Sequence, residues 1–242
     1  MRITRLHCSQ HLAEKEDVAL SQEQAHHLIN VLRHSSGDKV HVYNEADGEF
    51  EGALTVAKKS KATVSINSHL RSFKAPEFSI HLYLGVSRGD RMDFGIQKSV
   101  EMGVVSITPL FTEYGESKLK QSERLEKKIH HWQRIAESAS EQSGRLDVPM
   151  INSPAEFLTC IAKDSTTPNL IMDGSGSDSL SDVELNDAVN VFIGPEGGFS
   201  STELEKAKEN NYQVISLGPR TLRTETAPIT ALAILQHRFG DL

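Results

Sequence analysis

Two glycine- and proline-rich segments near the C-terminus constrain the fold of this chain most strongly. They read GPEGGFS over residues 194–200 and LGPRTLRTETA over residues 217–227. Each follows a short run of β-branched or aromatic residues and precedes an amphipathic helical pattern. A loop between a strand and a helix brings free backbone N–H groups to the carboxyl edge of a sheet, where α/β proteins bind ligands. The pair of loops therefore predicts an α/β domain with a ligand site.

From residue 78 onward, the pattern predicts strands that alternate with longer helices. The expected strands cover residues 78–84, 104–110, 170–172, 189–193 and 214–217, and the expected helices cover residues 90–102, 122–141, 204–209 and 226–239. Four apolar residues recur at helical spacing in the second of these helices and are expected to face the core: Leu125, Ile129, Trp132 and Ile135. The alternation predicts a mostly parallel sheet covered on both faces, with residues 173–182 as an exposed loop.

The N-terminal third has a different pattern. Short alternating segments over residues 39–43, 50–56 and 62–66, separated by polar turns, predict antiparallel strands that curl into a small barrel. A helix over residues 22–29 is expected between them, with Ser21 and Gln24 forming a capping box at its start. Residues 71–76 resemble a linker. The sequence thus predicts two domains, over residues 1–72 and 73–242.

Bulk composition narrows the class of protein. Hydrophobic residues make up 38% and charged residues 24% of the chain, which is ordinary for a soluble globular protein. No apolar run approaches the roughly 20 residues needed to cross a bilayer, and the first residues lack the apolar core of a secretory signal. We therefore expect a cytoplasmic protein. Cys8 and Cys160 fit no metal-ligand spacing, so free thiols and no metal site are expected.

Charge is distributed unevenly. The net charge of −7 argues against a simple polyanion binder, yet residues 1–74 hold ten Lys or Arg, nine Asp or Glu and seven of the eleven histidines. A nucleic-acid surface is therefore more plausible in the N-terminal third. Ordinary variation of charge between domains is the alternative, and charge alone does not decide between the two.

The first glycine-rich loop has the features of a ligand-binding turn. Its glycines let a ligand approach the backbone, Pro195 stiffens it, and Ser200 with Glu203 forms the capping box of the next helix. It lacks the lysine of a phosphate-binding loop and the spacing of a dinucleotide fingerprint, so phosphate binding is disfavoured. A tight turn that binds nothing remains the alternative.

The second loop concentrates charge before a helix. Arg220, Arg223 and Glu225 lie within six residues, which suits a polyanionic substrate whose reacting base must lose a proton. A surface ion-pair cluster that caps the helix is the alternative. Arg88 and Arg91, after the first strand of the second domain, belong to a polar cluster that suits either RNA phosphate or a helix cap, and Arg33 lies beside histidines that suit RNA or a solvated helix face.

These residues together resemble the 16S rRNA (uracil-1498-N3)-methyltransferase family (RsmE), bacterial enzymes that modify N3 of a uridine in small-subunit ribosomal RNA. The resemblance covers essentially the whole chain. It rests on HLINVLRHSSGD (27–38), SRGDRMD (87–93), IQKSVEMG (96–103), EQSGR (141–145), IGPEGGFS (193–200) and LGPRTLRTETA (217–227). The last two motifs together are the most specific.

The resemblance implies a SPOUT methyltransferase. Residues 1–72 are expected to form a PUA-like RNA-binding β-barrel, and residues 73–242 an α/β methyltransferase domain with a mostly parallel sheet and a deep trefoil knot. The enzyme is expected to be a homodimer joined through this domain, with S-adenosyl-L-methionine bound bent among the knot loops. The implied cofactor-binding residues are Met172, Gly174, Gly194, Pro195, Glu196, Gly197, Leu217, Gly218, Leu222 and Arg223. The expected RNA contacts are Arg5, Arg33, Arg88, Arg91 and Arg220.

Methylation of a uracil N3 requires removal of its proton, because the protonated imide nitrogen has no useful lone pair. We hypothesise that Arg223 orients the uracil or stabilises its developing anion, while Glu225 or a water that it holds takes the proton. The base must also be splayed out of its stack, which favours a structured RNA of the small ribosomal subunit as the partner.

Three other functions are compatible with parts of the pattern. A related knotted methyltransferase acting on another RNA, such as transfer RNA, shares the same two loops. An RNA-binding ribosome-assembly factor without catalysis is disfavoured because Arg223 and Glu225 are both present. A nucleotide hydrolase is disfavoured because the phosphate-loop lysine and an acidic pair for magnesium are missing.

Overall fold

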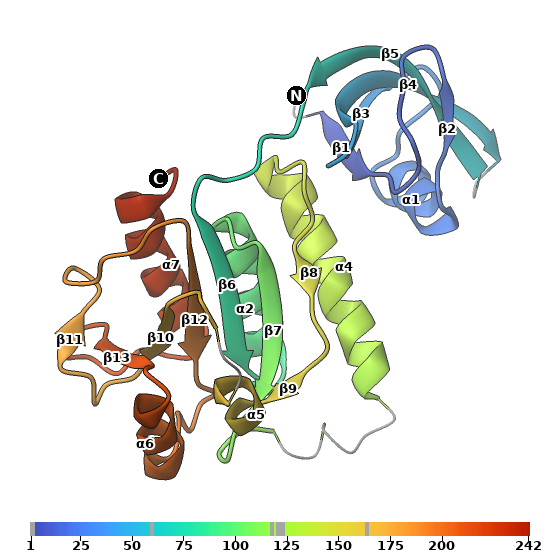
Figure 1. Ribbon diagram of the computed structural model, residues 1–242. Coiled ribbons are helices and arrows are strands. Elements are labelled where there is room, and N and C mark those ends of the chain that lie inside the picture. Colours follow the sequence, from blue (N-terminus) through green and yellow to red (C-terminus); the bar gives the residue numbers. More distant parts are fainter. Residues whose placement is uncertain (1–2, 59–60, 117–118, 120–123, 163–164) are drawn as a thin grey trace. The chain divides into compact units, whose positions relative to one another are not determined.

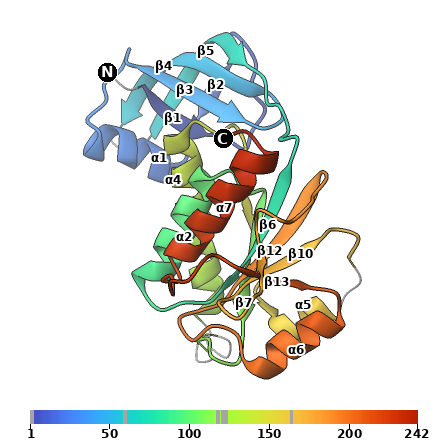
Figure 2. The same cartoon turned by 90° about the vertical axis from the view of Figure 1, so that its left-hand side faces the viewer.

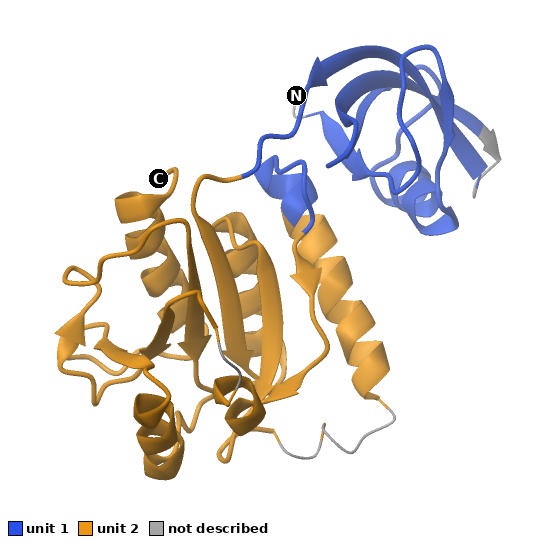
Figure 3. Ribbon diagram, in the orientation of Figure 1, with its two compact units in different colours: residues 1–75, 140–148 blue, residues 76–139, 149–242 orange. Residues whose placement is uncertain are grey.

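The computed structural model describes residues 3–58, 61–116, 119, 124–162 and 165–242 (Figure 1). The chain forms two compact units, which Figure 3 shows in different colours. Unit 1 comprises residues 1–75 and 140–148, and unit 2 comprises residues 76–139 and 149–242. A short segment from the middle of the chain thus belongs to the N-terminal unit.

Unit 1 is built on a five-stranded sheet in the order β1-β3-β4-β5-β2. Its strands are β1 (Thr4–His7), β2 (Asp17–Ala19), β3 (Lys39–Asn44), β4 (Gly48–Lys58) and β5 (Lys61–Arg71). The three strands predicted from alternation lie within β3, β4 and β5, which pair antiparallel as expected. β1, however, pairs parallel with β3, so the sheet is mixed. The alternating residues Val40, Val42 and Val64 are fully buried in its core.

A single helical segment interrupts these strands. α1 (Gln22–His26) begins with the predicted capping box, in which the Ser21 hydroxyl accepts the Gln24 N–H and the Gln24 side chain accepts the Ser21 N–H. The helix then widens into a π-helical turn, η1 (His27–Val31), so the helix expected over residues 22–29 changes type at His27. The wider turn keeps Leu28 fully buried while the chain leaves through Arg33 at a φ of 61°.

A buried charge cluster joins residues 140–148 to unit 1. The Glu49 side chain is 5% exposed and accepts hydrogen bonds from Arg5 Nε at 2.6 Å, Arg71 Nε at 2.6 Å and His41 Nδ1 at 3.0 Å. Burial raises the pKa of Glu49, but these hydrogen bonds outweigh it and lower the pKa to about 2. The remaining Arg5 N–H groups donate to the carbonyls of Ser140, Glu141 and Arg145.

Unit 2 contains a parallel sheet, as the sequence predicts. Its order is β11-β13-β10-β12-β6-β7-β8, with β9 paired to β7, and every strand pair recorded in it is parallel. The strands are β6 (Ser79–Gly85), β7 (Ser106–Phe111), β8 (Met150–Ile151), β9 (Ala155–Glu156), β10 (Asn169–Met172), β11 (Asp178–Ser179), β12 (Ala188–Ile193) and β13 (Gln213–Ser216).

Helices cover both faces of this sheet. They are α2 (Asp90–Glu101), α4 (Leu125–Ser143), α5 (Phe157–Ile161), α6 (Ser201–Glu209) and α7 (Thr226–Phe239). Figures 1 and 2 show α2 and α7 side by side on one face and α5 and α6 on the other. Beneath α5 and α6, Phe157, Phe192 and Tyr212 form an aromatic core, with the rings of Tyr83 and Phe192 stacked at 4.2 Å.

The predicted helices and strands of unit 2 all occur, with ends shifted by a few residues. Ser122, where the second helix was expected to begin, lies outside the described residues. In α4, Trp132 is buried as predicted, while Leu125, Ile129 and Ile135 are half-buried. The short elements β8, β9, α5 and β11 were not predicted. β11 corrects the prediction of an open loop over residues 173–182, because this segment pairs with β13 and buries Leu180.

Among the described residues, no helix is long and apolar enough to cross a membrane. The same residues contain no group of three or more His, Cys, Asp or Glu side chains arranged to hold a metal ion. Cys8 is buried and Cys160 half-buried, and neither forms a disulfide.

Candidate functional site

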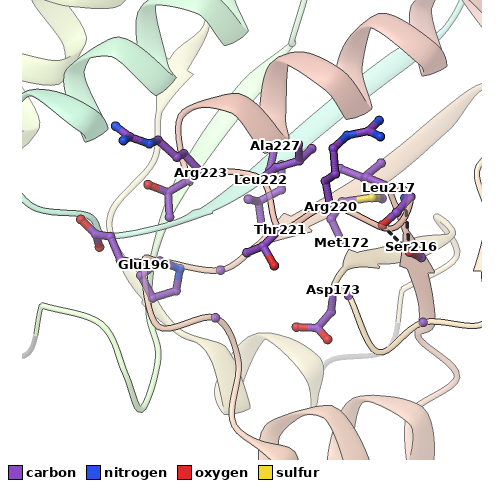
Figure 4. Close-up of a pocket in the computed structure, with 18 of the residues that line it drawn as sticks. Met172, Asp173, Glu196, Ser216, Leu217, Arg220, Thr221, Leu222, Arg223 and Ala227 are labelled. Carbon is purple, nitrogen blue, oxygen red and sulfur yellow. Dashed lines mark hydrogen bonds between the residues drawn. The ribbon is translucent and has the colours of Figure 1, made fainter.

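Three loops meet at the carboxyl edge of the parallel sheet in unit 2. β10, β12 and β13 are neighbours, and Met172 at the end of β10 is in register with Ile193 of β12 and Ile215 of β13. Because the strands are parallel and end together, the chain leaves all three at the same edge. The loops that follow, with Arg91 from α2, enclose a cavity of about 920 Å³ (Figure 4).

Backbone conformation explains two glycines in these loops. Gly218 has a φ of +104°, which L-amino acids with a side chain rarely adopt, and its N–H donates to the Ser216 hydroxyl at 3.3 Å. At Gly197 the reason is space, since a Cβ atom would lie 2.6 Å from the Cβ of Tyr114. The first loop therefore packs directly against the chain that follows β7.

The end of the first loop is fixed by the capping box predicted at Ser200 and Glu203. The Ser200 hydroxyl accepts the Glu203 N–H at 3.2 Å, and the Glu203 carboxylate accepts the Ser200 N–H at 2.8 Å. The other carboxylate oxygen accepts the N–H of Glu113 at 3.0 Å. Glu203 is only 4% exposed, so one buried carboxylate holds together the start of α6 and the segment after β7.

Glu196 joins the first loop to the chain that follows β6. Its carboxylate accepts the backbone N–H of Arg88 at 3.1 Å and pairs with Arg91 at 3.2 Å. Partial burial raises the pKa of Glu196, but backbone hydrogen bonds, including that from Arg88, and the charge of Arg91 lower it overall. Glu196 therefore carries a negative charge at neutral pH and is poorly suited to act as a proton acceptor.

The second loop brings Arg223 and Glu225 together. Arg223 Nη1 lies 3.8 Å from Glu225 Oε1, and the hydroxyl of Thr224 donates to Glu225 Oε2 at 3.2 Å. The Arg223 side chain is 79% exposed, so it is free to contact a ligand, whereas Glu225 is 19% exposed. Figure 4 places Arg223 and Glu196 on one side of the cavity and Met172 and Leu217 on the other. Figure 4 also places Arg220 beside Leu217, so charged side chains lie on both sides of the cavity.

The structure brings the expected cofactor-binding residues to one cavity. All ten of them line it: Met172, Gly174, Gly194, Pro195, Glu196, Gly197, Leu217, Gly218, Leu222 and Arg223. Of the expected RNA contacts, Arg91 and Arg220 also line it, but Arg88 does not and instead pairs at 3.1 Å with Glu116. Glu225 lies beside the lining residues rather than among them.

Several lining residues were missed by sequence reasoning. They include Gly176, Ser177 and Ser216. Ser216 lies at the carboxyl end of a predicted strand, and this position is the signal that could have identified it. Gly176 and Ser177 belong to the segment that was expected to be only an exposed loop.

The two expected RNA contacts in unit 1 differ in their surroundings. Arg5 is 12% exposed and its guanidinium is taken up by Glu49 and by carbonyl oxygens, which favours a structural role over contact with RNA. Arg33 is exposed and follows Val31 and Leu32, whose side chains are 57% and 44% exposed. Only Arg33 of the pair therefore presents an accessible cation.

Two family models match the chain. A model described as an RNA methyltransferase domain matches residues 74–236, and one described as an RNA methyltransferase PUA domain matches residues 20–67. The cavity described above lies wholly within the first match.

Related proteins match over nearly the full length. Proteins named ribosomal RNA small subunit methyltransferase E are 35% identical in Buchnera aphidicola subsp. Schizaphis graminum, covering 100% of this chain and 98% of the relative, and 26% identical in Bacillus subtilis, covering 95% and 93%. A solved structure from Neisseria gonorrhoeae, a ribosomal RNA small subunit methyltransferase E bound to S-adenosyl methionine, superposes with a TM-score of 0.90 at 32% identity over 100% of both chains. A Legionella pneumophila protein, assigned as a methyltransferase and solved with the cofactor SAM, gives 0.93 at 35% identity, again over 100% of both chains.

Proposed function

The chain belongs to the ribosomal RNA small subunit methyltransferase E family, and from this premise we propose that it transfers a methyl group from S-adenosyl-L-methionine to N3 of a uridine in 16S ribosomal RNA. The observation that carries the proposal is the cavity at the ends of β10, β12 and β13, lined by both glycine-rich loops. The choice of a uridine and of its N3 atom goes beyond the family membership and belongs to the proposal.

The cavity fits the cofactor in size and character. Its volume of about 920 Å³ lies within the range of cofactor sites, which span roughly 300–1,000 Å³. At Gly174 and Gly218 a Cβ atom would meet nothing within 4 Å, so ligand atoms can approach the backbone closely there. We assign the adenosine part to the loop backbones and to Met172, Leu217 and Leu222. S-adenosyl-L-methionine, when bound, supplies an electrophilic methyl group on a sulfonium centre.

The protein's own task is to present a deprotonated uracil to that methyl group. Arg223, exposed and on the same side of the cavity as Glu196, is placed to orient the uracil and to stabilise the negative charge that develops as the N3 proton leaves. Glu225 lies 3.8 Å from Arg223 and is the carboxylate that we assign to accept the proton, directly or through a water. Glu196 is bound to Arg88 and Arg91 and instead positions them.

We further propose that the RNA is held by exposed cations of both units. Arg33 of unit 1 and Arg88, Arg91 and Arg220 of unit 2 are exposed at their ends, and such groups bind phosphate. The proposed partner is the small ribosomal subunit in the cytoplasm. The homodimer through residues 73–242, the trefoil knot in that domain and the RNA-binding barrel over residues 1–72 also stay proposals, and the full-length family match supports them.

The test is a methyl-transfer assay with labelled S-adenosyl-L-methionine and small ribosomal subunits that lack the modification, followed by nucleoside analysis. We expect 3-methyluridine in the 16S rRNA. Methyl transfer to a different nucleoside, or to transfer RNA but not to small subunits, would refute the proposed substrate assignment. Absence of transfer to any RNA, with cofactor binding intact in calorimetry, would refute the proposed activity.

A further inference from the structure

The cavity provides no aromatic side chain, although the substrate proposed for it is a base taken out of its stack. None of the residues that line it is Phe, Tyr, Trp or His. Proteins that hold an unstacked base usually stack it on an aromatic ring, which replaces part of the energy lost when the base leaves its neighbours. An exposed ring at the edge of the cavity is therefore a candidate for this contact.

Tyr114 is such a ring. It is 55% exposed, whereas Tyr43 and Tyr212 are buried and Tyr83 stacks on Phe192. Within the described part of the chain, no aromatic or cationic side chain stacks on Tyr114. A single exposed ring is common on protein surfaces, so the position of Tyr114, rather than its exposure, points to a role.

Its backbone places Tyr114 beside the part of the first loop that contains Glu196 and Gly197. A Cβ atom on Gly197 would lie 2.6 Å from the Cβ and 3.4 Å from the Cγ of Tyr114, so the tyrosine packs against the first loop. Gly197 directly follows Glu196, which Figure 4 shows on the same side as Arg223. Tyr114 is thus next to the side of the cavity to which we assign the reacting uracil.

The segment around Tyr114 is held in place from both sides. The N–H of Glu113 donates to buried Glu203, and Glu116 pairs at 3.1 Å with Arg88, whose own N–H is bound to Glu196. The 83% exposed Arg88 side chain thus adds a cation next to the chain segment that carries Tyr114. An exposed aromatic ring on a segment with a neighbouring cation is a combination that binds single-stranded RNA.

We propose that Tyr114 stacks on the target uracil and positions it in front of Arg223. This inference rests on the proposed function and adds to it a positioning residue that selects for the base itself. Because stacking needs only an aromatic face, phenylalanine or tryptophan at this position should serve, whereas leucine should not. Leucine keeps the Cβ and Cγ atoms that contact Gly197, so this variant tests the effect of losing the ring while the packing against the first loop is kept.

The experiment compares the full-length protein with Tyr114→Leu, Tyr114→Phe and Tyr114→Trp. Small subunits are reconstituted with rRNA that carries either uridine or an abasic nucleotide at the target position, and their affinities are measured with S-adenosyl-L-methionine present. The preference of the wild type for uridine over the abasic site should fall by about 5- to 150-fold in Tyr114→Leu, the range expected from loss of one base stack. It should stay within about threefold in Tyr114→Phe and Tyr114→Trp, and the cofactor affinity should be unchanged in all three.

An unchanged preference in Tyr114→Leu would overturn the inference. Loss of cofactor affinity in Tyr114→Leu without a change in that preference would overturn it as well, because Tyr114 would then only support the first loop. If the wild type itself does not methylate the uridine-containing subunits, the proposed function fails. The two failures are distinguishable, since one appears in the wild type and the other only in the variants.

Discussion

The buried charge cluster of unit 1 predicts how its stability depends on pH. The pKa of Glu49 is lowered from 4.5 to about 2 by its bonds to Arg5, Arg71 and His41, which outweigh the opposing effect of burial. A carboxyl group with a lowered pKa stabilises the folded state above its unfolded pKa, and this contribution is lost as the pH falls through the folded pKa. The stabilisation by Glu49 is therefore complete above about pH 5, small near pH 2 and lost below it.

The size of this stabilisation follows from the pKa shift of Glu49. Each pKa unit corresponds to about 1.4 kcal/mol, so a fall from 4.5 to about 2 gives roughly 3 kcal/mol. Arg71 is 52% exposed and water screens its share, so we expect about 2–3 kcal/mol. Glu49→Gln removes the negative charge that pairs with Arg5, whose side chain is only 12% exposed. It should lower the free energy of opening of unit 1 by this amount at pH 7.

Hydrogen exchange followed by mass spectrometry measures this opening in peptides from β3 to β5. The matched control is Glu51→Gln on the same strand, because the ion pair recorded for Glu51 among the described residues is with Lys39, which is 66% exposed, and such a pair stabilises little. At each pH, Glu49→Gln is compared with this control. The difference should be largest at pH 7 and should become small toward pH 2, where the carboxylate of Glu49 in the wild type begins to be protonated. Equal exchange at pH 7, or a difference that does not depend on pH, would refute the reasoning.

Three further changes test the site in unit 2. Glu203→Ala removes a helix cap and the acceptor of the Glu113 N–H, so it should lower the unfolding free energy by about 2 kcal/mol in urea denaturation. The control, Glu205→Ala on the exposed face of α6, should change it very little. Gly218→Ala places a residue with a side chain at a φ of +104°, which strains the backbone by about 1–2 kcal/mol and should weaken cofactor binding in calorimetry. An unaltered cofactor affinity would count against a role of this loop in cofactor binding. Arg223→Ala should slow single-turnover methyl transfer by about 100-fold or more while the cofactor affinity stays within about threefold. Normal turnover in that variant would eliminate the assigned role.

Local sequence signals were sufficient for the elements that lead into the site. Short runs of β-branched and aromatic residues predicted the strands β6, β10, β12 and β13, because each of these strands is buried on one or both faces. The capping boxes at Ser21 and Ser200 were predictable because they depend on two side chains three residues apart. Such features need no knowledge of distant parts of the chain.

Features that depend on distant contacts could not be predicted in this way. β11 has two residues and exists only because β13 lies beside it, and the end of α4 belongs to unit 1 only through contacts such as those of Arg5, about 135 residues away in sequence. Arg5 illustrates the difficulty, since an arginine near the N-terminus of a protein expected to bind RNA looks like a phosphate contact. Its carboxylate partner Glu49 and its carbonyl partners become visible only in the folded structure.

The same reasoning explains why the cavity can be built largely from backbone. A loop rich in glycine gives a ligand access to peptide groups but loses more conformational entropy on ordering than other loops. The structure offsets this loss with polar contacts to the loop: Glu203 fixes its end, and the backbone N–H of Arg88 and the side chain of Arg91 hold its Glu196. Because Arg91 is also a candidate for RNA contact, binding of RNA phosphate would compete with Glu196 for its charge. Substrate binding should then loosen the first loop unless the RNA itself adds contacts there, and stacking of the uracil on Tyr114 beside Gly197 supplies such a contact.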